Sequence, residues 1–125
     1  MLQRGDRIPH FEVTTLSGAR VSYATIWQQQ HLLLLILPTT ATDDEETYMR
    51  DFSAVATEVA DTACVVTRDS IPGMTVPAAI VADKWGEVIH ATTAASVGEL
   101  PSPEDLLDWI EYTRSKCPEC EGEAK

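Results

Sequence analysis

The sequence predicts an α/β fold, with a central mixed β-sheet flanked by helices on both faces. Three patterns lead to this prediction. Residues 32–37 form an unbroken apolar run, which is typical of a central strand that is covered on both sides. Residues 42–60 carry apolar side chains at helical spacing. Residues 76–91 hold two apolar segments joined by a short turn with glycine. A strand, a helix and a further strand in this order form a parallel crossover.

The first elements of the chain are short. Residues 11–16 alternate weakly between apolar and polar side chains and end at a Ser-Gly turn signal, so we expect a hairpin with the residues that follow. Residues 24–30 are expected to form one or two helical turns. The central strand over residues 32–37 then ends at Pro38.

The first long helix is predicted over residues 42–60. Its apolar side chains recur at steps of four, three and four residues, at Tyr48, Phe52, Val55 and Val59. This single stripe places Phe52 toward the core. Thr42, followed three residues later by Glu45, fits a capping box, and the acidic first turn complements the positive end of the helix dipole.

The second half of the chain supplies three strands and a helix. Residues 62–66 are predicted to be a buried strand, and residues 76–82 and 88–91 form the predicted hairpin. The last helix is expected to begin after Ser102, with Pro103 in its first turn. Its inward side chains are expected to be Leu106, Leu107 and Ile110.

Length and charge limit the classes of protein. The chain has 125 residues, 9 of them basic and 20 acidic, with a formal net charge of −11. One domain over residues 1–116 and an acidic tail over residues 117–125 account for the whole chain. Such a charge repels nucleic acid and anionic lipid surfaces, so we expect neither as a partner. No signal segment is visible and the three cysteines form no disulfide framework, so a cytoplasmic location is expected.

Five segments follow one another in the order and spacing of a known family. They are GDRIPHF at 5–11, LSGARVS at 16–22, the strand that ends at Pro38, TRDS at 67–70 and VPAAIVADKWGEV at 76–88. In this order they resemble redoxin domains, the group that contains thioredoxin-like reductases and the peroxiredoxins of the alkyl hydroperoxide reductase–thiol-specific antioxidant group. The resemblance covers most of residues 5–115. It implies a thioredoxin-like fold, with Pro77 at the position of the family's cis-proline.

The family's reactive residues lie just after the central strand. Peroxiredoxins place a threonine four residues after the proline that ends this strand, and the peroxide-reacting cysteine three residues further. Counted from Pro38, these positions hold Thr42 and Glu45, and residues 38–48 contain no cysteine. A carboxylate cannot replace a thiolate in peroxide reduction or disulfide exchange. We therefore expect Glu45 to cap the helix and ordinary peroxidase activity to be absent.

The three cysteines lie outside that site. Cys64, in the predicted strand over residues 62–66, is expected to pack as a small apolar side chain. Cys117 and Cys120 form a Cys-Pro-Glu-Cys motif after the last helix, with the spacing of a redox dithiol and also of half a zinc site. Neighbouring glutamates and the helix C-terminus favour the protonated thiols.

Three interpretations of Cys117 and Cys120 stay open. They are inert thiols, a redox dithiol that works with a protein partner or a thiol reductant, or half of a zinc site. Zinc would need two further ligands, from a second chain of a homodimer or from a histidine. The redox interpretation makes the chain a redoxin-like thiol–disulfide oxidoreductase or relay. The inert interpretation makes it a binding or structural module with an acidic surface for a basic partner. No cofactor other than zinc is indicated.

Overall fold

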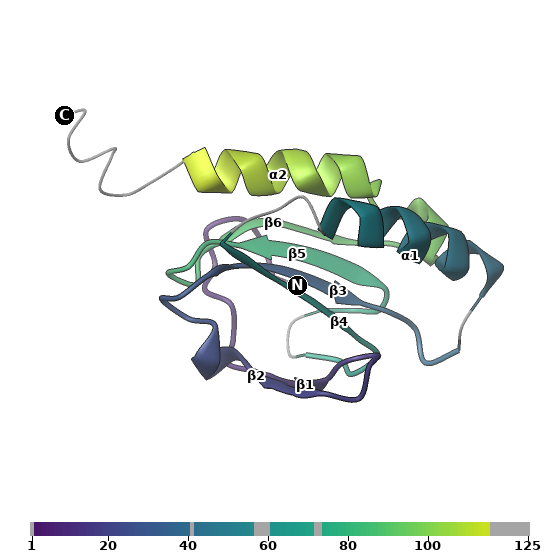
Figure 1. Ribbon diagram of the computed structural model, residues 1–125, viewed down its shortest axis with the longest axis horizontal. Helices are drawn as coiled ribbons and strands as arrows, with labels where there is room; N and C mark the ends of the chain where they lie inside the picture. The colour runs from purple at the N-terminus through teal and green to yellow at the C-terminus, as the bar shows by residue number, and fades with distance from the viewer. Residues whose placement is uncertain (1, 41, 57–60, 72–73, 116–125) are drawn as a thin grey trace.

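The computed structural model of the protein describes residues 2–40, 42–56, 61–71 and 74–115 (Figure 1). Its elements are β1 (Glu12–Thr14), β2 (Arg20–Ser22), the 3-10 helix η1 (Tyr23–Thr25), β3 (His31–Ile36), α1 (Asp43–Ala56), β4 (Thr62–Thr67), β5 (Ala78–Ala82), β6 (Val88–Thr93), the 3-10 helix η2 (Val97–Glu99) and α2 (Pro103–Ser115). None of the helices in the described ranges is both long and apolar enough to cross a membrane.

A four-stranded mixed sheet in the order β4-β3-β5-β6 forms the centre of the molecule (Figure 1). β3 and β4 run parallel, from the pair His31 and Thr62 to the pair Ile36 and Thr67. β5 runs antiparallel to both β3 and β6. Every residue of β3 is buried, because this strand has a neighbour on each side and both faces of the sheet are covered. The predicted central strand and crossover are therefore confirmed.

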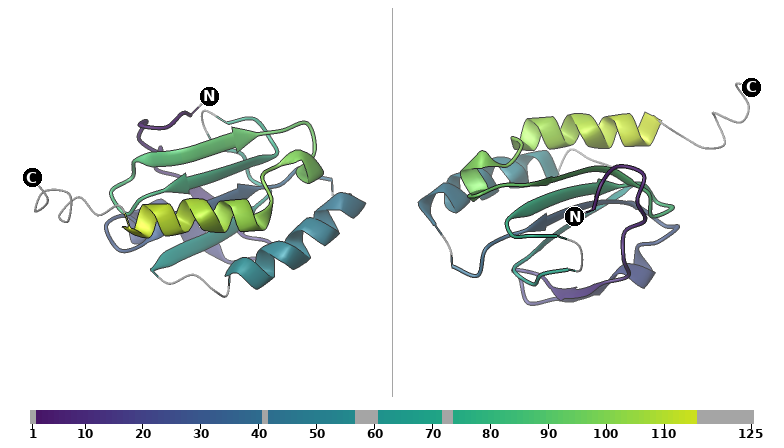
Figure 2. Two further views of the ribbon diagram at one scale, coloured as in Figure 1. Left: turned by 90° about the horizontal axis from the view of Figure 1, so that it is seen from above. Right: turned by 180° about the vertical axis from the view of Figure 1, so that it is seen from behind.

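The two faces of the sheet are covered by different kinds of structure. Both long helices, α1 and α2, lie on one face (Figures 1 and 2). Phe52 and Leu35 belong to the apolar cluster on that face. The β1–β2 hairpin and η1 lie on the other face, where Tyr23 and Leu34 belong to a second cluster. Alternate residues of β3 thus supply the two clusters, as the two-residue period of a strand requires.

The expectation of helices on both faces is wrong for the second face. Among the described residues that cover this face, only the three-residue η1 is helical, and β1 and β2 are three residues each. The apolar side chains there include Val13 of β1 and Phe11, which precedes that strand. A hairpin can cover a sheet face as well as a helix can, since burial depends on apolar area and not on the type of element.

Helix α1 has the predicted apolar stripe. Tyr48, Phe52 and Val55 are buried along it. Val59 and the remaining end of the predicted helix lie outside the described residues. The three buried residues, separated by two successive steps of helical spacing, therefore pack α1 on the sheet.

Helix α2 begins at Pro103, as predicted. The Ser102 hydroxyl oxygen accepts a hydrogen bond from the Asp105 backbone N–H at 3.2 Å, which is an N-cap contact. Of the three side chains expected to face inward, Leu106 and Ile110 are fully buried and Leu107 is half-buried.

The turn between β5 and β6 is held by one aspartate. An oxygen of the Asp83 carboxylate accepts the backbone N–H groups of Trp85 at 2.9 Å and Glu87 at 3.0 Å. Gly86 has φ +85°, in the left-handed region that favours glycine. A Cβ at this position would lie 3.2 Å from the Tyr23 hydroxyl oxygen. The turn therefore needs glycine both for its backbone angle and for its packing.

Candidate functional site

The predicted site lies at the C-terminal end of β3, where the chain leaves the sheet for α1. Ile36, the last residue of β3, pairs with Ala78, the first residue of β5. Pro77 therefore lies on the neighbouring segment at this same end of the sheet. The peptide bond between Val76 and Pro77 is cis, as the resemblance implies. The topology thus brings the start of α1 and Pro77 to one end of the molecule.

Glu45 is buried at this end although it is charged. It lies in the first turn of α1 and is 6% exposed. Its two carboxylate oxygens accept parallel hydrogen bonds from Arg68, which follows β4 directly: Nη1 donates to Oε1 at 2.9 Å, and Nη2 donates to Oε2. Nη1 of Arg68 also donates to the carbonyl of Pro38. One guanidinium therefore joins the ends of β3 and β4 to the start of α1.

The reciprocal hydrogen bonds of the capping box predicted for Thr42 and Glu45 do not form. The backbone N–H of Glu45 donates to the Thr42 carbonyl at 3.1 Å. The Glu45 carboxylate pairs with Arg68, 23 residues away in sequence, instead of turning back to Thr42. Thr42 itself is exposed. Local spacing could not predict this, because the partner reaches Glu45 only through the parallel crossover from β3 to β4.

The ion pair determines what this position can do chemically. The hydrogen bonds to Glu45 raise the pKa of Arg68 above its ordinary value, so the guanidinium stays charged. Two parallel hydrogen bonds fix both groups in one plane, as is usual for arginine with a carboxylate. Carboxylate and guanidinium have no thiol redox chemistry. The junction is therefore closed by a structural contact where the resemblance would place a reactive cysteine.

Cys64 is the cysteine that the structure describes. It lies on β4 beside Leu33 of β3 and packs, half-buried, against the cluster under the helices. Burial raises the pKa of its thiol to about 11, so it is protonated at neutral pH. The prediction that Cys64 packs as a small apolar side chain is confirmed.

The other two predicted cysteines, Cys117 and Cys120, lie outside the described residues, as does the tail over residues 117–125. Their redox and zinc interpretations stay predictions. Within the described part of the chain, no group of three histidine, cysteine, aspartate or glutamate side chains is placed to hold a metal ion. His10 lies beside Tyr23, and His90 stacks on Trp109 with ring centroids 4.6 Å apart.

A groove that sequence reasoning did not find lies between α1 and the segment that leads into α2. Its volume is about 590 Å³, and its lining residues include Asp44, Asp51 and Glu99. The Tyr48 hydroxyl donates to the carbonyl of Pro101 at 2.6 Å and joins the two walls. Asp44 and Asp51 are seven residues apart on α1, a spacing that signals one helix face. No sequence pattern indicated the opposite wall.

Comparison with known proteins gives the fold. No family model matches the sequence, and no curated protein matches it. The structure is similar to that of AhpC from Mycobacterium tuberculosis, with a TM-score of 0.68 and 13% identity over 95% of this chain and 98% of that chain. A thiol:disulfide interchange protein of the thioredoxin family from Chlorobium tepidum TLS gives a TM-score of 0.63 and 13% identity, over 90% of this chain and 99% of that chain. Reduced 2-Cys peroxiredoxin from Plasmodium vivax gives 0.68 and 12%, over 90% and 82%.

These likenesses establish the fold class. The chain has an α/β thioredoxin-like fold of the kind found in thioredoxin-family proteins and peroxiredoxins, which confirms the fold that the sequence predicts. At such identities the likeness concerns the fold and not the activity.

Proposed function

We propose that the chain is a redoxin-type thiol–disulfide oxidoreductase or relay that works through Cys117 and Cys120. The observation that carries this proposal is the ion pair of Glu45 and Arg68, which fills the junction after β3 with groups that have no thiol chemistry. Cys64 is half-buried, with a raised thiol pKa. We therefore assign thiol exchange to Cys117 and Cys120, which have the spacing of a dithiol.

The proposed reaction is an ordinary thiol–disulfide exchange. The thiolate of one cysteine attacks a disulfide of a partner protein and forms a mixed disulfide, and the second cysteine displaces the partner's sulfur. The partner gains two thiols while Cys117 and Cys120 become a disulfide. A thiol reductant of the cytoplasm, the location we propose for the chain, must then return the pair to its dithiol form. The acidic neighbours lower the thiolate fraction, so the exchange depends on a partner that favours the thiolate.

The proposal is tested by reduction of a disulfide-bonded protein, such as insulin, in the presence of a thiol reductant. We expect the full chain to accelerate this reduction and the double variant Cys117→Ser/Cys120→Ser to be inactive. Cys64→Ser is the matched control and should keep full activity. Equal rates for the full chain and the double variant would overturn the proposal.

Hydrogen peroxide gives a second, independent test of the closed junction. Peroxide consumption with a thiol reductant should stay at background, because residues 38–48 hold no cysteine. Rapid turnover that survives the replacement of both Cys117 and Cys120 would mean that the chemistry is at another site.

Zinc analysis separates the redox role of the pair from its alternative as a metal site. One zinc ion for two chains, lost in the variant Cys117→Ser/Cys120→Ser, would assign the pair to a site shared within a homodimer. If the pair works as a relay, we expect the purified full chain to contain Cys117 and Cys120 as reduced thiols without bound zinc.

A second candidate function is that of a binding module for a basic partner. The acidic groove favours it, because Asp44, Asp51 and Glu99 line one concavity and none of them is in an ion pair with another described residue. A clustered field of one sign speeds the encounter with a partner of opposite charge. Salt-sensitive retention of a basic peptide that is lost in Asp44→Asn/Asp51→Asn/Glu99→Gln would favour this candidate. Retention that the three substitutions leave unchanged would exclude the groove.

A further inference from the structure

His31 lies at the end of the sheet opposite to the ion pair of Glu45 and Arg68. It is the first residue of β3 and is 8% exposed. Its backbone N–H donates to the carbonyl of Asp61 at 2.9 Å. The Nδ1 atom of its ring lies 3.1 Å from the backbone N of Lys84. A backbone N–H can only donate, so Nδ1 accepts this hydrogen bond and the ring of neutral His31 carries its proton on Nε2.

The partner of this ring belongs to the turn over residues 83–87, between β5 and β6. Other segments bind the same turn through its carbonyls. The backbone N–H of Gln28 donates to the carbonyl of Lys84 at 2.6 Å, and the backbone N–H of Ile8 donates to the carbonyl of Gly86 at 2.9 Å. The turn is thus held from three sides, and the contact from β3 is made by an ionisable side chain. The hydrogen bonds from Gln28 and Ile8 do not change with protonation.

We propose that His31 is a pH-sensitive latch that holds the turn over residues 83–87 against β3. The neutral ring accepts the N–H of Lys84 and keeps the latch closed. Protonation places a proton on Nδ1, so two N–H groups then face each other and the hydrogen bond is lost. The turn must move away from the ring, or the ring must move toward solvent, to separate them. This inference goes beyond the exchange proposed for the dithiol and does not depend on it.

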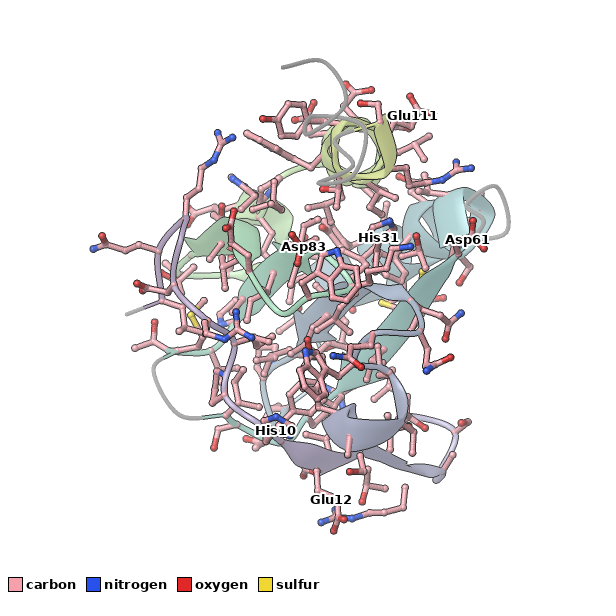
Figure 3. The ribbon with its side chains drawn as sticks, turned by 90° about the vertical axis from the view of Figure 1, so that its left-hand side faces the viewer. His10, Glu12, His31, Asp61, Asp83 and Glu111 are labelled. Atoms are coloured by element: carbon pink, nitrogen blue, oxygen red, sulfur yellow. The ribbon has the colours of Figure 1, made fainter. Side chains whose placement is uncertain are left out.

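The charged groups around His31 shift the pKa of its ring in both directions. Lys84 of the turn and Arg114 of α2 oppose a charged ring, and Asp83 of the turn and Asp61 before β4 favour it. Figure 3 shows His31 between Asp83 and Asp61, with Glu111 of α2 on the same side of the molecule.

Burial is the largest of these effects, and it lowers the pKa of His31 below its ordinary value. The folded chain therefore binds fewer protons at this ring than the unfolded chain does as the pH falls below about 6.5. The stability that His31 contributes is complete above that pH and is lost as the pH falls through the pKa of the folded state. The latch is closed at pH 7 and opens in acid.

The test is amide hydrogen exchange of the full chain at pH 7.5 and 5.0, corrected for the intrinsic dependence of exchange on pH. We expect the protection of the Lys84 amide to fall about tenfold at the lower pH, which corresponds to the loss of one hydrogen bond. The Leu37 amide, which donates to the Thr67 carbonyl at the other end of the sheet, is the internal reference and should not change. Equal protection of Lys84 at both pH values would overturn the latch.

Two further measurements tie the effect to this ring. In His31→Leu the Lys84 amide should be unprotected at both pH values, whereas His90→Gln, a histidine replaced outside the latch, should keep the pH dependence. Because His31→Leu is a core substitution, NMR titration of the unmodified chain serves as the second readout. The His31 ring and the Lys84 amide should titrate with one midpoint, and different midpoints would contradict the proposal. The variant Cys117→Ser/Cys120→Ser should behave as the unmodified chain, whatever its exchange activity.

Discussion

Glu45 places a carboxylate at a position that is only 6% exposed, and among the described residues Arg68 is the cation that pairs with it. Burying a carboxylate is unfavourable unless it is paired and hydrogen-bonded. Arg68 supplies both, and it also binds the carbonyl of Pro38 at the end of β3. The two residues thus depend on each other, and neither is expected to be replaceable alone.

Replacement of Arg68 alone should destabilise the fold, because it leaves Glu45 buried without a cation. We expect Arg68→Ala to lower the free energy of unfolding by about 2–3 kcal/mol at pH 7. This is less than the cost for a fully buried pair, because 30% of the Arg68 side chain is exposed. Urea unfolding measures the change.

The control for this variant is an exposed ion pair of the same kind. Arg20 pairs with Glu12 at 2.9 Å, and more than half of each side chain is exposed. Arg20→Ala should therefore cost less than about 1 kcal/mol. The double variant Glu45→Ala/Arg68→Ala should have a higher free energy of unfolding than Arg68→Ala alone, because it no longer contains the unpaired buried carboxylate. A double-mutant cycle measures this coupling. Similar losses for Arg68→Ala and Arg20→Ala would contradict a structural ion pair at Glu45.

Gly86 allows a second prediction at the level of one residue. Gly86→Ala places a Cβ 3.2 Å from the Tyr23 hydroxyl oxygen at a backbone φ of +85°, so we expect a loss of about 2–3 kcal/mol. Gly18→Ala is the matched control, because Gly18 has φ +91° but no atom within 4 Å of its Cβ position. It should lose only the conformational part, about 1–2 kcal/mol. Thermal or urea unfolding of both variants measures the difference, and equal losses would mean that Tyr23 does not restrict this turn.

At the level of the elements, periodicity predicted what depends on local sequence. The apolar run of β3 and the stripe of α1 identify a buried strand and a helix, because side-chain direction follows the period of each element. The cover of the second face by the β1–β2 hairpin was not predictable in the same way. β1 shows the alternation of a strand, with Val13 buried between two exposed residues, but three residues are too few to indicate which face of which sheet they cover.

The stripe of α1 is open to a direct test at Phe52, which is 2% exposed between helix and sheet. Phe52→Ala removes most of a buried aromatic side chain, and we expect a loss of about 3–5 kcal/mol in the free energy of unfolding. Ser53→Ala, at the neighbouring exposed position, is the control and should change stability little. A loss below about 1 kcal/mol in Phe52→Ala would mean that the stripe does not face the core.

At the level of the whole molecule, the order of segments carried more information than any one of them. It predicted the fold, and the resemblance it carries implied the cis bond before Pro77 and a position for the family's reactive site. The occupant of that site, Glu45, was visible in the sequence, whereas its partner Arg68 was not, because the pairing depends on how β3, β4 and α1 meet. The acidic groove was missed for the same reason, since its walls come from α1 and from residues 96–103.

If the junction at Glu45 has no reactive thiol, the thiol chemistry of the whole chain depends on Cys117 and Cys120. The spacing of these two cysteines limits how much their oxidation can change the stability of the fold. A disulfide between them closes a ring of only four residues, so it removes little entropy from the unfolded chain. Oxidation should therefore change the free energy of unfolding by no more than about 2 kcal/mol.

Acidic neighbours disfavour the thiolates of Cys117 and Cys120, which removes one source of oxidising power known from dithiols at helix N-termini. We therefore expect the pair to act as a reductant or a slow relay. Its reduction potential, measured against glutathione, decides this: a value near about −120 mV, that of a strong protein oxidant, would contradict the electrostatic argument.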